Sequence, residues 1–187
     1  MKYNTLINKN NILKDDYKIG KLVSVGKHFN KNEDILLEKK AAKALNKMLL
    51  NVNHKFPNIK IIPDSGYRNL EYQKKVMDYY IEHEGEEKAK KRVALPGTSE
   101  HHTGLAIDVA MVNNGIYNDN ITGKEAPIIF LHNNCYKYGY ILRFPKDKEN
   151  ITYVMSEPWH FRYVGKKLAK YLYQHNLTLE EFYINKQ

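Results

Sequence analysis

The sequence contains a single cysteine, Cys135, among 187 residues. One thiol cannot form an intramolecular disulfide, and it cannot supply the cysteine cluster of a structural zinc site. Any bound metal ion must therefore take its ligands from histidine, aspartate or glutamate side chains.

Long apolar segments are also missing. The longest apolar runs, such as residues 126–131, fall far short of the roughly 20 residues that a membrane-spanning helix needs. The N-terminal residues MKYNTLINKNN contain no apolar stretch typical of a signal peptide. The sequence as written predicts a cytoplasmic protein without a membrane span, whereas a trimmed chain would fit an extracytoplasmic place at the cell wall.

Arginine is scarce although the chain is basic. The 30 lysines and arginines exceed the 21 aspartates and glutamates by nine charges, but only four of the basic residues are arginines. Specific readout of bases relies heavily on arginine side chains, and the longest basic block is residues 88–92. We therefore interpret the lysines as a solvated surface, suited to an anionic polymer or a carboxylate substrate, and predict no nucleic-acid binding.

Enough apolar residues remain for one folded domain. Hydrophobic residues make up 42% and aromatic residues 12% of the chain, which excludes a wholly disordered protein. The length fits a single domain. Residues 1–33 are polar and irregular and are predicted to form an arm packed on the domain of residues 34–187.

Helical spacing of apolar residues begins near Asp34. Residues 34–50 are predicted to form a helix with Asp34 as its N-cap. A second helix is predicted over residues 70–83, capped by Asn69 and ended near Gly85.

Strands alternate irregularly with these helices. Short β-branched or apolar runs predict strands at residues 59–62, 105–112 and 140–144. The first should be broken at Pro63, and residues 113–123 should form a turn-rich surface excursion. The last helix should start at Thr178, where Glu181 completes a capping box. The mixture predicts an α+β fold.

Asp108 is the acidic residue within the apolar run 105–112. A buried carboxylate without a partner is costly. A zinc ion shared with His101 would supply that partner, and Gly104 would let the chain turn between the two ligands. Alternatively, Asp108 pairs with a lysine or caps a helix, and His101 or His102 is simply exposed.

The segment around His160 favours the metal hypothesis. A catalytic zinc ion needs three protein ligands and an open position, and His101, Asp108 and His160 form a suitable set. Glu157, three residues earlier, would face the bound water as a general base, and its alternative is a surface salt bridge. Trp159 is predicted to pack in the core.

Arg68 follows the predicted strand at 59–62 and Ser65-Gly66. An arginine at such a place suggests recognition of an oxyanion or carboxylate, with a structural ion pair as the alternative. Gln73, five positions later, is near enough to line the same cleft, although it could also be a surface helix residue.

Three segments resemble one known family. SGYR, PGTSEHHTGLAID and EPWHFRYVG are similar to the zinc D-Ala-D-Ala metallopeptidases of the VanY and VanXY type. The chain meets the fixed positions of the family patterns SxHxxGxAxD and ExxWH with Ser99, His101, Gly104, Ala106, Asp108, Glu157, Trp159 and His160. Similarity extends over most of the chain.

The resemblance implies a compact α+β domain of the Hedgehog and D-Ala-D-Ala peptidase kind, with a central antiparallel sheet flanked by helices. It implies one zinc ion per chain, held by His101, Asp108 and His160. It makes Glu157 the catalytic base, and it makes Arg68 the group that stabilises the transition state and the substrate carbonyl.

The resemblance also implies substrate contacts for Ser99, Gln73, Tyr67 and Trp159, whereas His102 occupies a variable position and is not counted as a ligand. It predicts a monomeric carboxypeptidase that removes a C-terminal D-alanine from peptidoglycan stem peptides or precursors. The D-Ala-D-Ala dipeptide would be a second substrate in a VanXY-like enzyme.

Other activities on the same fold stay open at this stage. An L,D-carboxypeptidase would cut tetrapeptide stems, and an endopeptidase would cut within the stem. A zinc-bearing binding module without catalysis is a further alternative, but the presence of Glu157 and Arg68 beside a full ligand set argues against it.

Overall fold

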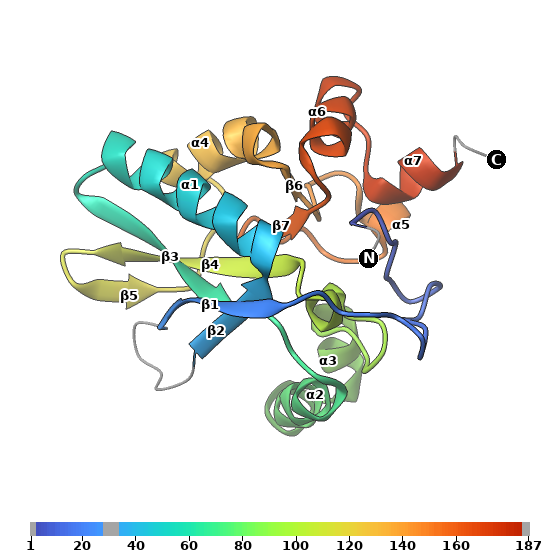
Figure 1. Cartoon of the computed structure of the whole chain (residues 1–187). Helices are drawn as coiled ribbons and strands as arrows, with labels where there is room; N and C mark the ends of the chain where they lie inside the picture. The colour runs from blue at the N-terminus through green and yellow to red at the C-terminus, as the bar shows by residue number, and fades with distance from the viewer. Residues whose placement is uncertain (1–2, 28–33, 185–187) are drawn as a thin grey trace.

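An antiparallel sheet separates two groups of helices (Figure 1). The computed structural model describes residues 3–27 and 34–184, with a few side chains left out. In chain order the elements are β1 Leu22–Lys27, β2 Asp34–Glu38, α1 Lys39–Lys55, β3 Ile59–Ser65, α2 Leu70–Glu84, α3 Glu86–Arg92, the 3-10 turn η1 Glu100–Thr103, β4 Ala106–Asn113, β5 Ile116–Asn118, α4 Ala126–Asn134, the 3-10 turn η2 Cys135–Tyr138, β6 Tyr140–Leu142, α5 Glu149–Thr152, β7 His160–Tyr163, α6 Lys166–Gln174 and α7 Leu179–Ile184.

The main sheet has the strand order β3-β4-β7-β6, and β5 pairs with β4 beside this path. All its pairings are antiparallel. Helices α1 and α4 lie on one side of the sheet, and α2 and α3 lie on the other (Figure 1). This arrangement confirms the predicted α+β fold with an antiparallel sheet flanked by helices.

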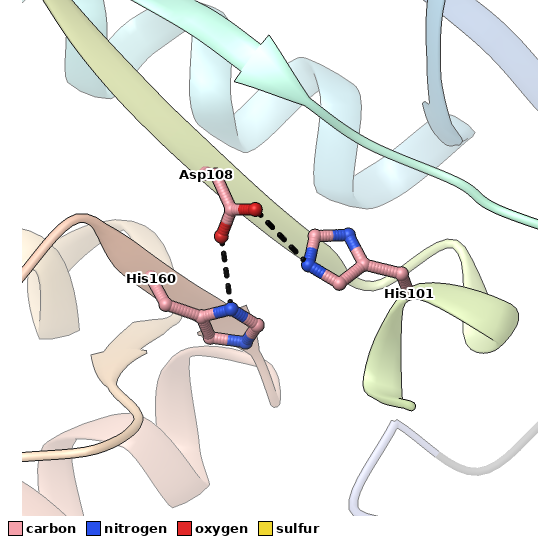
Figure 2. Close-up of side chains that lie close together, drawn as sticks. All are labelled: His101, Asp108 and His160. Carbon is pink, nitrogen blue, oxygen red and sulfur yellow. Dashed lines mark ion pairs between the residues drawn. The ribbon is translucent and has the colours of Figure 1, made fainter. Parts of the chain in front are cut away.

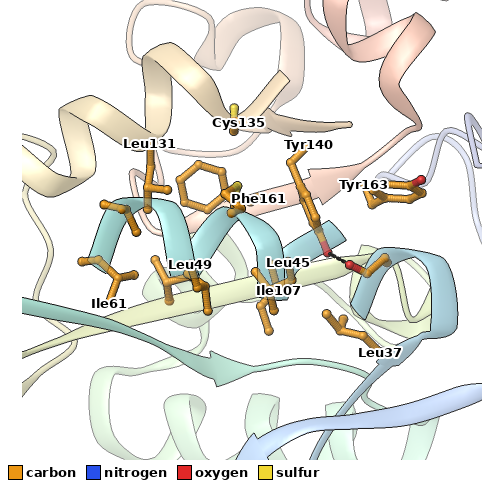
Figure 3. Close-up of a cluster of buried hydrophobic side chains, with 14 of the residues drawn as sticks. Leu37, Leu45, Leu49, Ile61, Ile107, Leu131, Cys135, Tyr140, Phe161 and Tyr163 are labelled. Carbon is orange, nitrogen blue, oxygen red and sulfur yellow. Dashed lines mark hydrogen bonds between the residues drawn. The ribbon is translucent and has the colours of Figure 1, made fainter. Parts of the chain in front are cut away.

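The main core lies between α1 and the sheet. Helix α1 places six apolar residues inward at helical spacing: Ala41, Ala42, Leu45, Met48, Leu49 and Val52. They belong to one buried cluster with Ile61 of β3, Ile107 of β4 and Phe161 of β7 (Figure 3). The side chain of Ile107 faces α1, so Asp108, the next residue in the strand, points to the opposite face.

The helix predicted over residues 34–50 is partly wrong. Residues 34–38 form strand β2, which pairs antiparallel with β1, and the helix begins only at Lys39. Glu38, not Asp34, is the N-cap, because its carboxylate accepts hydrogen bonds from the backbone N–H groups of Lys40 and Ala41. The side chains of Ile35 and Leu37 are buried, so burial alternates along the strand with a period of two residues. A segment of five residues directly before a helix is too short for this period to be told from the helical one.

Two strand predictions also need correction. Strand β3 continues through Pro63 to Ser65, which a proline tolerates because β3 is an edge strand of the main sheet. The excursion at residues 113–123 contains the short strand β5, whose pairing with β4 is set by a turn at Asn114 and Gly115.

The helix predicted over residues 70–83 is confirmed as α2, with Asn69 as its N-cap and Gly85 at its end. The capping box at Thr178 is also confirmed. None of the described helices has the length and apolar character that crossing a membrane requires.

Residues 3–21 contact the domain at two places. The guanidinium of Arg162 donates to the carbonyl oxygens of Tyr3 and Thr5, and Leu13 donates its N–H to the carbonyl of Gly97. The division of the chain at residue 34 stays a prediction, and residues 28–33 lie outside the described residues.

Candidate metal centre

Three adjacent segments carry the candidate ligands. Asp108 lies on β4, His160 is the first residue of β7, and His101 lies in the turn just before β4. The sheet register pairs Asp108 with His160 on one side and with Ser65 on the other. The antiparallel register therefore brings residues far apart in sequence to one point on the sheet.

The side chains of these three ligands, here called the ligand cluster, point toward one another (Figure 2). His101 Nε2 lies 3.3 Å from Asp108 Oδ2, and His160 Nδ1 lies 2.9 Å from Asp108 Oδ1. One ligand atom from each residue can be chosen so that all lie within 4.8 Å of one another. Ligand atoms at about 2.0 Å from a tetrahedral zinc ion lie about 3.3 Å apart, so the spacing fits such an ion.

Asp108 Oδ1 supplies an independent sign of a cation. This oxygen is buried and has no hydrogen-bond partner among the described residues, although His160 Nδ1 is only 2.9 Å away. The two atoms are close without being aligned for a hydrogen bond. A cation that both atoms approach would satisfy them, and two imidazole nitrogens with one carboxylate are a donor set that zinc accepts.

The end of β3 fixes the ring of His101. Its Nδ1 lies 2.6 Å from the carbonyl oxygen of Gly66, which can only accept, so Nδ1 carries the proton and Nε2 is left for a metal ion. A side chain at Gly66 would lie only 2.4 Å from the backbone oxygen of Leu36. Gly66 is therefore required where β3 passes β2 and reaches His101.

His102 is engaged at both ring nitrogens. Its Nδ1 lies 2.7 Å from the carbonyl oxygen of Arg68, and its Nε2 accepts a hydrogen bond from the N–H of Gly97. The side chain is buried. It thus offers no nitrogen to a metal ion and instead ties the 3-10 turn to the segment that carries Arg68.

The charges around the cluster favour a cation. Burial would lower the pKa of His160, but the nearby carboxylates of Asp108 and Glu100 outweigh burial and raise it to about 9. Burial would raise the pKa of Asp108, but His101 and His160 hold it well below its usual range. Burial, with Arg68 nearby, lowers the pKa of His101 to about 4, which keeps that ring neutral as a ligand must be.

Glu157 borders the ligand cluster. Its side chain is 17% exposed, and its Oε2 lies 3.5 Å from His160 Nδ1. Burial raises the pKa of Glu157 to about 7, with Asp108 also raising it and His160 opposing. A carboxyl group that exchanges its proton near neutral pH has the property that a general base needs.

Arg68 also contacts the ligand cluster, through Asp108. Its Nη2 donates to Asp108 Oδ2 at 3.2 Å, and its Nη1 donates to Gln73 Oε1 at 3.2 Å. Gln73 is buried, and its Nε2 donates to the carbonyl of Ala94. Gln73 therefore orients Arg68, whereas its predicted contact with substrate stays a prediction.

The remaining predicted substrate contacts have structural neighbours of their own. Ser99 is buried, and its Oγ accepts a hydrogen bond from the N–H of His101. Tyr67 and Trp159 are half-buried, and Trp159 packs against the main core as expected. Whether any of the three contacts a substrate stays a prediction.

One residue of the site is absent from the sequence-based assignment. Glu100 is buried between the motif residues Ser99 and His101, and its carboxylate faces His160. A glutamate in a polar loop normally lies in solvent. Its place beside His101 was the available signal, but its buried arginine partners, Arg143 and Arg162, are distant in sequence.

Comparison with known proteins places the chain in a class of carboxypeptidases. Residues 34–166 match the family described as VanY: D-alanyl-D-alanine carboxypeptidase. This segment is more than half of the chain, and the chain belongs to that family. The resemblance found in the three motifs is thereby confirmed.

Two curated relatives match nearly the whole chain. YodJ of Bacillus subtilis (strain 168) is 41% identical over 181 residues, which are 95% of this chain and 66% of YodJ. The bifunctional D-Ala-D-Ala dipeptidase and D-Ala-D-Ala carboxypeptidase VanXYC of Enterococcus gallinarum is 34% identical over 181 residues, which are 95% of this chain and 92% of VanXYC. The chain thus spans about two thirds of the length of YodJ.

Solved structures agree with this placement. The LD-carboxypeptidase LdcB has a TM-score of 0.80 at 41% identity, covering 95% of this chain and 84% of LdcB. A mutant of the D,D-pentapeptidase VanY in complex with Zn(II) has a TM-score of 0.79 at 31% identity, covering 96% of this chain and 98% of the VanY chain. VanYB in complex with D-alanine-D-alanine has a TM-score of 0.80 at 30% identity, covering 99% of both chains.

Proposed function

We propose that the chain is a zinc-dependent carboxypeptidase that releases a C-terminal D-alanine from peptidoglycan stem peptides or their precursors. The observation that carries this proposal is the convergence of His101, Asp108 and His160 on one point, with Glu157 and Arg68 beside it. Relatives that bind Zn(II) and D-alanine-D-alanine support it.

His101 Nε2, one oxygen of Asp108 and His160 Nδ1 would hold one zinc ion. When bound, zinc polarises a carbonyl group and lowers the pKa of a water molecule. Glu157 would accept the proton of the attacking water and then deliver it to the nitrogen of the departing D-alanine. Its pKa, raised to about 7 by burial, suits both steps.

Arg68 would stabilise the negative charge that develops on the substrate carbonyl oxygen. Its guanidinium is held by Gln73 and Asp108, and its Nε is buried without a partner in the described part of the chain. Donors that are already oriented lower the barrier most, because they need no reorganisation during the reaction.

A second candidate is an L,D-carboxypeptidase that acts on tetrapeptide stems. The similarity to LdcB, at 41% identity, favours it. The D,D candidate is favoured by VanXYC and by the complex of VanYB with D-alanine-D-alanine. The two candidates would share the ligands and the base and differ in the length of the stem peptide and in the residue before the scissile bond.

The deciding experiment incubates the zinc-loaded protein with the D-Ala-D-Ala dipeptide, a tetrapeptide and a pentapeptide, and identifies the products by mass spectrometry. Release of D-alanine from the pentapeptide supports the D,D candidate, and release from the tetrapeptide supports the L,D candidate. Glu157→Gln protein is the matched control. Release of no D-alanine from any of the three would contradict the proposal.

A further inference from the structure

A buried group of four charged side chains lies directly behind His160. This arginine cluster consists of Glu100, Arg143, Arg162 and Glu180, each at most 5% exposed. Arg143 donates from Nε to Glu100 Oε1 at 2.8 Å and from its two terminal nitrogens to Glu180 at 2.6 and 2.8 Å. Arg162 Nη1 lies 2.8 Å from the same Glu100 oxygen.

The two oxygens of Glu100 therefore have different surroundings. Oε1 faces Arg143 and Arg162, whereas Oε2 is buried without a hydrogen-bond partner among the described residues. The atom facing Oε2 is His160 Nε2, at 3.5 Å, which is also buried and also lacks a partner. This contact is longer than a normal hydrogen bond.

The two guanidinium groups require a negative charge on Glu100, so its carboxylate can only accept hydrogen bonds. The His160 nitrogen that faces it is then the one that carries the proton. In the neutral ring that a metal ligand requires, the other nitrogen, Nδ1, then keeps its lone pair and points to Asp108. His101 has the opposite arrangement, because its Nδ1 donates to Gly66 and its Nε2 faces Asp108 Oδ2.

We propose that Glu100 is a positioning residue that fixes the ring orientation and protonation of His160, so that Nδ1 is presented to the metal ion. This inference rests on the proposed function for the identity of the metal. Partners of this kind typically change metal affinity by roughly 10- to 100-fold when they are removed. Arg143 and Arg162 hold the carboxylate in place, and Glu180 anchors Arg143 from the other side.

Glu100→Gln gives a sharp test because the geometry determines which way the amide points. Arg143 Nε donates to Oε1 and Arg162 Nη1 lies 2.8 Å from the same oxygen, so the amide oxygen must take that place, and the amide NH₂ group must take the place of Oε2. A donor then faces His160 Nε2. This reverses the requirement on the ring and favours the proton on Nδ1, the nitrogen that should bind the metal ion.

Glu180→Gln is the matched control. It removes a negative charge from the same buried cluster, next to the same Arg143, but in the described part of the chain Glu180 forms no hydrogen bond or ion pair with His160. Both variants should unfold at lower temperature than the wild type. Only Glu100→Gln should weaken zinc binding, by about 10- to 100-fold in competition with a chromophoric chelator, while Glu180→Gln stays within about threefold.

Nitrogen-15 NMR of the His160 ring in the zinc-loaded wild type gives a second, variant-free measurement. We expect a proton on Nε2 and the metal ion on Nδ1. The opposite assignment, or equal zinc affinities of the two variants, would overturn the inference. Neither measurement uses a substrate, so failure to release D-alanine would count against the proposed function alone.

Discussion

The arginine cluster and the ligand cluster are both buried and meet at His160, but they differ in their balance of charge. The arginine cluster pairs two arginines with two glutamates, and each side chain has an opposite charge within 2.8 Å. Around the ligand cluster, Asp108 pairs with Arg68, the one permanent cation that forms an ion pair there among the described residues.

This difference separates a structural cluster from a binding site. Burial opposes the ionisation of Glu100, but Arg143 and Arg162 outweigh it and hold the pKa of that carboxyl well below its usual range. Asp108 Oδ1, in contrast, is left without a hydrogen bond in the described part of the chain. A balanced buried cluster defines the fold, whereas a cluster in which two imidazoles converge on an unsatisfied carboxylate oxygen is suited to bind a cation.

Replacing a metal ligand should have the largest effect, because the two remaining ligands would not hold the zinc ion. His101→Ala, Asp108→Ala and His160→Ala should each lower zinc content from about one ion per chain and abolish measurable turnover. Metal analysis after dialysis measures this. His102→Ala is the control, since both nitrogens of that ring are already engaged, and it should retain zinc. Full zinc occupancy in a double variant of His101 and His160 would refute the ligand assignment.

Glu157→Gln should separate catalysis from metal binding. The amide keeps the shape of the side chain but cannot take a proton from water, so kcat should fall by about 10²- to 10⁴-fold while zinc stays stoichiometric. In the wild type the base must be ionised, so activity should fall as pH drops below the pKa of about 7. That acidic limb should be lost in the variant. Turnover within about threefold of wild type would show that another group is the base.

Arg68→Lys should have a smaller effect. Lysine keeps the positive charge beside Asp108 but cannot reproduce the fork of donors that also reaches Gln73. We expect zinc content and folding to be retained and kcat to fall by about 10²-fold, as for the loss of an oxyanion donor. Steady-state kinetics on a stem peptide measures this, and near-normal turnover would mean that Arg68 is only a structural partner of Asp108.

The metal ligands and the helix caps could be predicted from the sequence because each is determined by residues close together in the chain. The ligands of η1 and β4 lie seven residues apart, and Asp108 is conspicuous as an acid in an apolar strand. The capping residues of α2 and α7 are equally local signals. The antiparallel sheet was expected only through the family resemblance.

The errors all involve long-range contacts. Residues 34–38 form a strand because β1 pairs with them, and β5 exists because β4 lies beside it. Glu100 belongs to the site because Arg143, which directly follows the edge strand β6, and Arg162 of β7 reach its carboxylate. No pattern within a few residues of these positions contains that information.

Thr178→Ala should have the smallest effect and shows how far the two clusters are independent. Thr178 directly precedes α7, which carries Glu180: the N–H of Thr178 donates to Glu181 Oε2, and the N–H of Glu181 donates to Thr178 Oγ1. Loss of such a cap typically costs about 1 kcal/mol, which urea unfolding would measure. Zinc affinity should stay within about twofold, because Glu100 keeps Arg143 and Arg162 as partners. A parallel loss of zinc affinity would show that the site depends on the anchoring of α7, and the two clusters would then be one.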